Sequence, residues 1–308
     1  MVQNILVVGG QVLALFFMIA AGFALTKCKF VTEKGAGQMA SISFYVVTPC
    51  VIIHSLQRER SVPLMRNMGM SILIFAGVVF LGTLISFFFF RNHTPEHQRI
   101  LRFAVSYSNC GYMGLPLVQA VLGESAVIYA AGAVIAFNLL LWTEGIFLIG
   151  GKKYVSLRKA LLNPGTIGFA IGFLLFAFEI TLPNVLGEVV KMFADMNTPL
   201  AMLIIGTYFA HTKFGELFRS RSLYLVCFLR LILIPAIITA ALYPLHLSYD
   251  LYASSVITAS APVAAATTMF IAKFNMNTRL ASQSVTLSTL LSILTMPIFA
   301  SFVALLVQ

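Results

Sequence analysis

Apolar segments of about twenty residues follow one another along the whole chain. Of its 308 residues, 59% are hydrophobic and only 10% are charged, whereas a soluble domain has about 25% charged residues. A segment of about twenty apolar residues is long enough to cross a hydrocarbon core as an α-helix. A membrane β-barrel would show short alternating segments instead, and the sequence lacks them. We therefore expect an all-α integral membrane protein.

Polar residues divide the chain into ten expected spans. The spans lie near residues 5–25, 36–56, 67–90, 98–121, 125–149, 160–180, 186–210, 222–243, 250–272 and 281–307. Two starts have a local reason, because Thr94-Pro95 and Asn163-Pro164 each place a capping residue before a proline at the first helical position.

The basic residues predict how the chain sits in the membrane. A net charge of +10 could point to nucleic acid in a soluble protein. In a membrane protein it reflects the excess of Lys and Arg in cytoplasmic loops, so no nucleic-acid partner is predicted. Fifteen of the twenty Lys and Arg residues follow spans 1, 3, 5, 7 and 9. We expect a multi-pass protein of the cell (inner) membrane, surrounded by lipid, with both termini non-cytoplasmic.

The two halves of the sequence echo each other. The Thr-Pro pairs that end at Pro49 and Pro199 are 150 residues apart, and Pro116 and Pro262 are 146 apart. Pro116 and Pro262 are each predicted to break a span, span 4 and span 9, near mid-membrane. Five spans per half is an odd number, so the second half should enter the membrane inverted. This pattern predicts five-helix repeats over 1–150 and 151–308, an arrangement typical of secondary transporters.

The segment around Asn109 is the strongest candidate for a binding site. Pro116 removes a backbone donor, and Gly111 and Gly114 give the chain freedom to unwind. Unpaired backbone groups at that depth are tolerated only beside protein or a water-filled cavity. If span 4 crosses the similar segment around Pro262, two half-helix N-termini face one point and favour an anion. The alternative is that both prolines only kink packed helices.

Several motifs resemble the auxin efflux carriers, a family that includes bacterial malate and malonate permeases and plant PIN-type carriers. They are Asn109–Leu117, Asn138–Gly145, Asn163-Pro164, Thr198–Gly206, and Ser284–Ser292 with Thr295-Met296-Pro297. The resemblance implies a fold similar to that of bile-acid and sodium/proton carriers. Spans 1, 2, 6 and 7 would form a scaffold, and spans 3–5 and 8–10 an elevator-like transport domain in which spans 4 and 9 cross. It is also compatible with a homodimer formed through the scaffold.

This reading predicts a transporter for a small organic anion, a carboxylate. The expected substrate-binding residues are Asn109, Gly111, Tyr112, Gly114, Pro116, Pro262 and Asn138. Asn138, which is polar and mid-span, is expected to hydrogen-bond between helices unless it faces the crossing.

Three ionisable residues within the expected spans are candidates for coupling, because such groups are usually functional. Glu144 and Arg230 could pair with each other or act in coupling or substrate binding. Asp195 could bind a coupling proton, or it could lie in a hydrated cavity entrance.

Other functions fit the sequence less well. His93-Thr-Pro-Glu-His97 matches a zinc-peptidase pattern, but Pro95 is best used as a helix start, which leaves His93 outside the helix. We expect no enzyme, no cofactor and no metal site. An anion channel would need a continuous polar pore, and a membrane sensor or receptor subunit would usually add a soluble signalling domain. The sequence does not identify the substrate, the direction of transport or a coupling ion.

Overall fold

The computed structural model describes residues 2–59, 61–211, 217 and 220–306. Regular structure in these residues is helical, and their extended pairing is limited to one antiparallel bridge between Ser108 and Val263. The all-α prediction is confirmed. Six helical segments are long and apolar enough to cross a membrane: Lys34–Ser55, Val62–Phe89, Glu124–Gly150, Asn184–His211, Arg221–Leu245 and Thr278–Val303.

The helices follow the expected spans closely. The first half contains α1 (Val2–Lys27), α2 (Glu33–Ile42), α3 (Thr48–Ser55), α4 (Val62–Phe89), α5 (Pro95–Ser106), α6 (Leu115–Leu122), α7 (Glu124–Leu140) and α8 (Ile146–Gly150). The second half contains α9 (Leu157–Leu161), α10 (Pro164–Ala177), α11 (Asn184–Asp195), α12 (Asn197–His211), α14 (Arg221–Phe228), α15 (Ile234–Leu242), α16 (Tyr249–Ser260), α17 (Ala266–Lys273) and α18 (Thr278–Leu306). The short 3₁₀ turns are Lys152–Tyr154 and Tyr243–Leu245.

Four π-helical turns continue these helices within single spans. They are Ser43–Val47, Cys110–Gly114, Leu141–Gly145 and Leu229–Leu233. Three of them come just before a proline near the start of the next helix, at Pro49, Pro116 and Pro235. Proline lacks an N–H and crowds the carbonyl four residues back. The wider turn lets the helix continue, because the residue before each proline bonds to a carbonyl five residues back.

The prediction that span 4 breaks at Pro116 was therefore wrong. Residues 110–122 form one continuous helix that contains Gly111, Gly114 and Pro116. The span is interrupted at residues 107–109, before that helix begins. In span 9 the interruption at 261–265 does contain Pro262.

The two predicted helix starts are confirmed. The side-chain oxygen of Thr94 accepts from the backbone N–H of His97, and that of Asn163 accepts from the N–H of Thr166. Pro95 and Pro164 are the first residues of α5 and α10. His93 consequently precedes α5, as predicted.

Small residues let pairs of helices approach to backbone contact. A Cβ atom at Gly22 of α1 would collide with the carbonyl of Leu203 in α12, and one at Gly206 would collide with the carbonyl of Ile19. Close packing at small residues is typical of helix pairs in membranes, where lipid gives helices little hydrophobic reason to associate.

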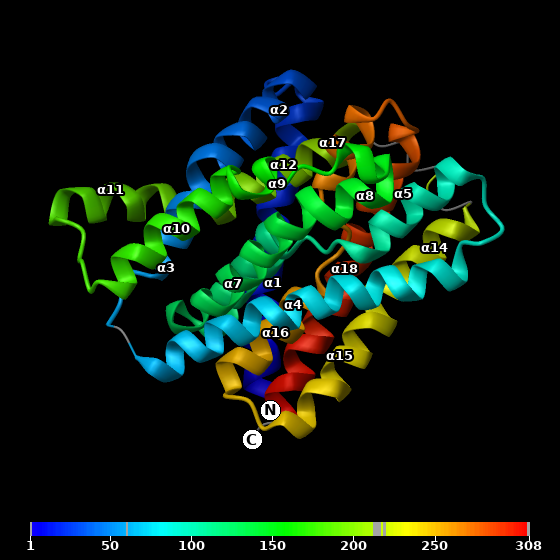
Figure 1. Ribbon diagram of the computed structural model, residues 1–308. Helices are drawn as coiled ribbons and strands as arrows, with labels where there is room; N and C mark the ends of the chain where they lie inside the picture. Colours follow the sequence, from blue (N-terminus) through cyan, green and yellow to red (C-terminus); the bar gives the residue numbers. More distant parts are fainter. Residues whose placement is uncertain (1, 60, 212–216, 218–219, 307–308) are drawn as a thin grey trace.

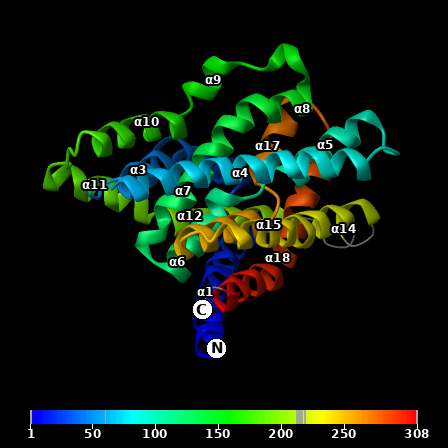
Figure 2. The same ribbon diagram turned by 60° about the horizontal axis from the view of Figure 1, so that its bottom comes forward.

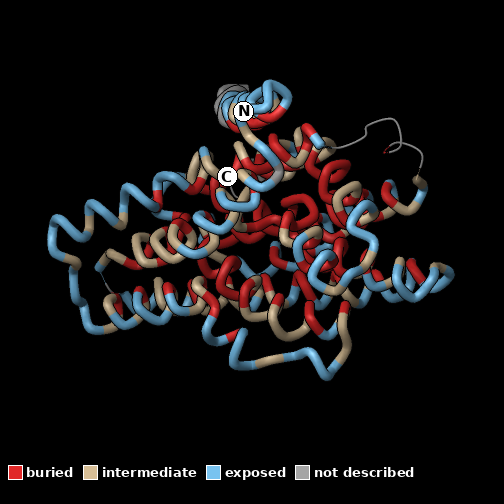
Figure 3. The backbone as a smooth tube through the Cα atoms, turned by 90° about the horizontal axis from the view of Figure 1, so that it is seen from above, coloured by how far each residue is buried: buried red, intermediate tan, exposed pale blue. Residues whose placement is uncertain are grey.

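Burial divides the molecule into a packed centre and an apolar periphery. All twelve residues of α16 except Tyr249 and Asp250 are buried, and α16 lies among α7, α15 and α18 (Figure 1). Turning the molecule shows α1 and α18 meeting at one side (Figure 2). Buried residues gather at the centre of the molecule and exposed residues at its periphery (Figure 3). Many of them are large and apolar, including Leu73, Phe80, Leu84, Ile171 and Leu174, which suits a surface in contact with lipid.

Candidate functional site

The two interrupted spans meet at the centre of the molecule. The backbone N–H of Asn109 donates to the carbonyl oxygen of Pro262 at 2.7 Å, and the N–H of Ala264 donates to the carbonyl oxygen of Tyr107 at 2.9 Å. This short antiparallel pairing satisfies backbone groups that the missing helical turns leave free. We call the paired interruptions, residues 107–109 and 261–265, the crossover.

Hydroxyl groups from neighbouring helices complete the backbone bonding of the crossover. Ser108 Oγ donates to the carbonyl of Thr258 in α16 at 3.0 Å. Ser288 Oγ of α18 accepts from the N–H of Val263 at 3.1 Å. Irregular backbone is therefore held inside protein, as a membrane interior requires.

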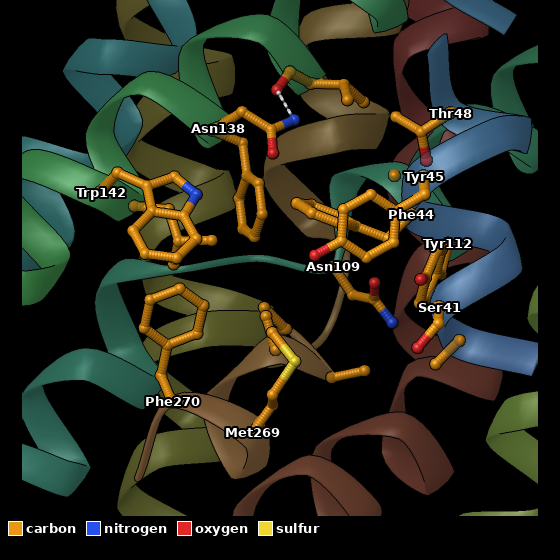
Figure 4. A pocket seen from close by; sticks show the side chains of 18 of the residues that line it. Ser41, Phe44, Tyr45, Thr48, Asn109, Tyr112, Asn138, Trp142, Met269 and Phe270 are labelled. Carbon is orange, nitrogen blue, oxygen red and sulfur yellow. Dashed lines mark hydrogen bonds between the residues drawn. The ribbon is translucent and has the colours of Figure 1, made fainter. Parts of the chain in front are cut away.

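A cavity of about 430 Å³ opens beside the crossover. Aromatic and aliphatic side chains form most of its wall, and Figure 4 shows Asn109 and Tyr112 across it from Trp142 and Phe270. The lining residues come from the second, fifth and seventh expected spans and from both interrupted ones: Gly37, Ala40, Ser41, Phe44, Tyr45, Thr48, Asn109, Gly111, Tyr112, Val134, Phe137, Asn138, Leu141, Trp142, Tyr208, Ala264, Ala265, Ala266, Met269, Phe270 and Lys273.

Asn109 brings a free hydrogen-bond donor to this cavity. Its side chain is only 5% exposed, and Nδ2 has no hydrogen-bond partner within the described residues. Buried polar groups are normally paired, so one without a partner needs an explanation. Asn109 lies in the wall of the cavity, and a ligand atom that reaches this wall would supply the missing acceptor.

Two helix N-termini also line the cavity. Gly111 and Tyr112 belong to the first turn of helix 110–122, and Ala265 and Ala266 begin α17. The N-terminal end of a helix carries partial positive charge and free N–H groups. Lys273, the last residue of α17, adds a full positive charge, and its Nζ lies 5.0 Å from the centre of the Trp142 ring. The cavity therefore presents positive potential beside an apolar wall.

Arg230 lies at the C-terminal ends of α5 and α16, the half-helices that precede the two interruptions. Its side chain is fully buried in the π turn between α14 and α15. One terminal nitrogen donates to the carbonyl of Val105 at 3.1 Å, near the end of α5, and the other donates to the carbonyl of Ala259, near the end of α16. A cation at the C-terminus of a helix is stabilised by the helix dipole. Arg230 thus bridges the two half-helices whose ends carry partial negative charge.

Comparison with known proteins decides the family. The sequence profile described as membrane transport protein matches two consecutive segments, residues 7–154 and 152–300, which together cover nearly the whole chain. The chain belongs to the membrane transport protein family. This is the auxin-efflux-carrier type of family that the motifs resemble, and that prediction is confirmed. No curated protein matches the chain.

Membership of the membrane transport protein family settles two broad expectations. The chain is a multi-pass membrane transporter, because its helices are apolar and its family transports solutes across membranes. It is not an enzyme.

In this membrane transport protein Glu144 and Arg230 do not pair. The two carboxyl oxygens of Glu144 form hydrogen bonds with Thr83 Oγ1 at 2.8 Å and with Tyr107 Oη at 2.5 Å. Arg230 bonds to backbone carbonyls, as described above. An ion pair does join Lys191 and Asp195, at 2.8 Å.

Asp195 lies away from the cavity. It ends α11, its side chain is half exposed, and it pairs with Lys191 one turn earlier in the same helix. Neither residue lines the cavity. A coupling role for Asp195 stays a prediction that no contact with the crossover supports.

The other predicted site residues fall into two groups. Asn109, Gly111, Tyr112 and Asn138 line the cavity. Asn138 thus faces the crossing, the stated exception to its expected bond between helices, and its Nδ2 donates to the carbonyl of Val134 in the same helix at 2.8 Å.

Gly114, Pro116 and Pro262 shape the site without lining the cavity. A Cβ at Gly114 would lie 3.2 Å from Cα of Thr258, so glycine permits helix 110–122 to pack against α16. Pro116 is buried further along that helix. Pro262 supplies the carbonyl that binds Asn109.

Most of the aromatic wall was not predicted from the sequence. Phe44, Tyr45, Trp142 and Phe270 lie on three different spans and share no spacing that would single them out. Lys273 was counted only as a loop charge. Its position at the end of a half-helix was a signal that could have placed it near the site.

Proposed function

We propose that the chain is a secondary carrier for a small organic anion, a carboxylate, which binds in the cavity beside the crossover. The observation that carries this proposal is that the negative and positive half-helix ends at the crossover face different surroundings. Arg230 holds the two C-terminal half-helix ends, while the two N-terminal ends face the cavity together with Asn109.

The magnitudes favour an anion. Each helix end carries about half an elementary charge. The two C-terminal ends therefore amount to about one negative charge, which the Arg230 guanidinium offsets. The two N-terminal ends leave about one positive charge directed at the cavity. A single carboxylate balances the charge of the two helix ends and accepts hydrogen bonds from Asn109 and the free N–H groups. Lys273 adds a further positive charge at the cavity.

The cavity also suits the carbon skeleton of such a ligand. Small-molecule sites are about 300–1,000 Å³ and largely apolar, with a few polar groups that fix orientation. This cavity has that character, with a volume of about 430 Å³. A carboxylate held at Asn109 would direct its carbon atoms toward Trp142 and Phe270.

The architecture that we propose for transport has ten membrane crossings in two inverted halves. The profile matches meet at residues 152–154, near the middle of the chain, and each half contains one interrupted span. Spans 1, 2, 6 and 7 form the scaffold and the dimer contact, and spans 3–5 and 8–10 move as an elevator. Both termini face away from the cytoplasm of the cell (inner) membrane, as the distribution of Lys and Arg indicates.

Exchange across proteoliposomes separates a carrier from the alternatives. Vesicles containing the purified protein are preloaded with unlabelled carboxylate, and uptake of the labelled compound is measured. In a carrier, unlabelled carboxylate inside the vesicle accelerates uptake of the labelled compound, because the binding site returns to the outside with substrate bound. An anion channel gives uptake that loading does not accelerate, and a sensor or receptor subunit gives none. Either of these results contradicts the proposal.

A further inference from the structure

Glu144 lies at the centre of a hydroxyl network that reaches the crossover. One carboxyl oxygen lies 2.8 Å from Thr83 Oγ1 of α4, and the other lies 2.5 Å from Tyr107 Oη. Tyr107 is fully buried and is the first residue of the crossover. The carboxyl group is thus one side chain away from the unwound backbone.

Three further contacts extend the network to backbone carbonyls. Thr83 Oγ1 lies 2.8 Å from Ser106 Oγ, and Ser106 Oγ lies 2.8 Å from the carbonyl oxygen of Arg102. Tyr107 Oη lies 2.9 Å from the carbonyl oxygen of Leu140. All of these are oxygen–oxygen contacts, so each needs a hydrogen atom between its two atoms.

The number of hydrogens favours a protonated Glu144. The network has five oxygen–oxygen contacts, and its three hydroxyl groups supply one hydrogen each. With an ionised carboxylate, the single hydroxyl hydrogen of Tyr107 can be donated either to Glu144 or to the carbonyl of Leu140, but not to both. With a protonated carboxyl, Glu144 donates to Tyr107 and Tyr107 donates to Leu140. One more contact then becomes a hydrogen bond.

The charged groups around Glu144 leave its carboxyl without an ion pair. No Lys, Arg or His nitrogen of the described residues lies within 4.0 Å of it. Arg102 of α5 stacks on the Phe87 ring at 4.1 Å, and Arg99 donates to the carbonyl of Ile149. The remaining basic groups on the adjacent elements are Arg66, His97, Lys152, Lys153, Arg158, Lys159 and Lys273, and none of them lies within 4.0 Å of the carboxyl group. A half-buried carboxyl without a cation partner is more easily kept neutral.

Glu144 also borders a depression that shares no lining residue with the anion cavity. Glu144 lines an open depression together with Thr143, Phe147, Lys152 and Val155. Lys152 and Val155 lie in the loop after α8, which the Lys and Arg distribution places on the cytoplasmic side. A proton route through this depression would not pass through the anion cavity, because the two share no lining residue.

Tyr107 connects that carboxyl to the anion site. Its backbone carbonyl accepts from the N–H of Ala264, a cavity-lining residue of the other interrupted span. Asn109, with the free amide, follows two residues later. An anion that enters this site brings negative charge toward Glu144 and so favours its protonated form.

We propose that Glu144 is a proton-binding site, linked through Tyr107 to the crossover, so that substrate anion and proton bind together. The coupling rests on the proposed anion carrier, whereas proton binding stands on the network alone. Linkage is reciprocal, so a proton on Glu144 strengthens anion binding by the same factor that the anion strengthens proton binding. The pair that crosses the membrane is then electrically compensated.

Infrared spectroscopy of the purified protein tests the proton site without any ligand. A protonated carboxylic acid has a carbonyl stretching band distinct from that of a carboxylate. We expect this band at neutral pH in the wild type and in Glu188→Gln, a control at an exposed glutamate of α11, and its loss in Glu144→Gln. A spectrum in which Glu144→Gln removes only a carboxylate band would overturn the proton assignment.

Calorimetric titration with a carboxylate in two buffers of different ionisation enthalpy tests the coupling. At a pH high enough to ionise Glu144 in the ligand-free protein, we expect proton uptake on binding in the wild type and in Glu188→Gln. We also expect an affinity that weakens roughly 5- to 150-fold as rising pH ionises Glu144. Glu144→Gln should bind without proton uptake and without that pH dependence. Binding without proton uptake in the wild type at that higher pH overturns the coupling. If the wild type binds no carboxylate at all, the carrier proposal fails, and the infrared result still decides the proton site.

Discussion

The backbone N–H of Asn109 donates a hydrogen bond to the backbone carbonyl oxygen of Pro262, with 2.7 Å between nitrogen and oxygen. This bond fixes Asn109 where two interrupted spans meet. It satisfies the backbone of Asn109 and leaves the side-chain amide without a partner at the cavity. The backbone N–H of Asn109 therefore holds the residue in place, and its side-chain Nδ2 is left to donate to a ligand.

Replacing Asn109 by alanine should weaken carboxylate binding without destabilising the protein. A hydrogen bond to a charged group contributes about 1.5–3 kcal/mol, so the dissociation constant should rise by roughly 10- to 150-fold. The melting temperature should stay unchanged, because Nδ2 has no partner to lose. Isothermal titration and thermal unfolding measure both, and Asn184→Ala, at an exposed position of α11, is the control. Undiminished affinity in Asn109→Ala would remove Asn109 from the site.

Two neighbouring glycines should respond differently to alanine. A Cβ at Gly114 would lie 3.2 Å from Cα of Thr258, whereas one at Gly111 would meet only a methyl of Val134, at 3.7 Å. Overpacking against backbone costs about 1–3 kcal/mol, so Gly114→Ala should melt at a lower temperature. Gly111→Ala should keep the stability of the wild type or exceed it. Equal melting temperatures for the two variants would mean that helix 110–122 does not pack against α16 as described.

Removing the buried cation should affect both stability and binding. Arg230→Met leaves the carbonyls of Val105 and Ala259 without their donor, and an unsatisfied buried group costs about 1–3 kcal/mol. It also leaves the negative half-helix ends unbalanced, which should weaken anion binding. Arg230→Lys keeps the charge and should recover binding more fully than stability, because one ammonium cannot reproduce both guanidinium bonds. A methionine variant with normal melting and normal affinity would show that Arg230 has no part in the electrostatics of the site.

Pro116→Ala should impair transport more than folding. Alanine restores the backbone N–H that proline lacks, so the π turn Cys110–Gly114 is free to tighten into an α-helical turn. Tightening would rotate Gly111 and Tyr112 relative to the cavity. Melting temperature should hold or rise, while carboxylate flux into proteoliposomes falls. Flux equal to that of the wild type would assign the proline a structural role alone.

The sequence predicted the helices well and the interruption of span 4 poorly. Apolar length and capping residues are local signals, and they placed the starts at Pro95 and Pro164 correctly. Pro116 suggested a break because proline removes a backbone bond. The helix instead continues past Pro116 by a π turn, as it does at Pro49 and Pro235. Which solution the chain adopts depends on the partner that pairs with residues 107–109, and a single sequence does not reveal that partner.

The candidate site was predictable only where its residues are locally unusual. Asn109 stood out as an amide inside an apolar span, and it lines the cavity. The aromatic wall did not stand out, because Phe44 or Phe270 in an apolar span looks like any lipid-facing or packed residue. Glu144 and Arg230 invited pairing as opposite charges. In the structure Glu144 instead bonds to hydroxyl groups, and Arg230 bonds to the carbonyls that end two half-helices.

Binding of an acid and its matched amide tests the central claim most directly. Thermal unfolding of the detergent-purified protein is measured with a series of small carboxylates, malate, malonate, aromatic acetic acids and 2-oxoacids, each beside its neutral amide and a cationic amine of similar shape. A ligand that binds the folded state raises the melting temperature. We predict that at least one acid does so, that its amide and amine do not, and that Asn109→Ala abolishes the effect. Stabilisation by an amide or an amine equal to that by the acid would contradict an anion site at the crossover.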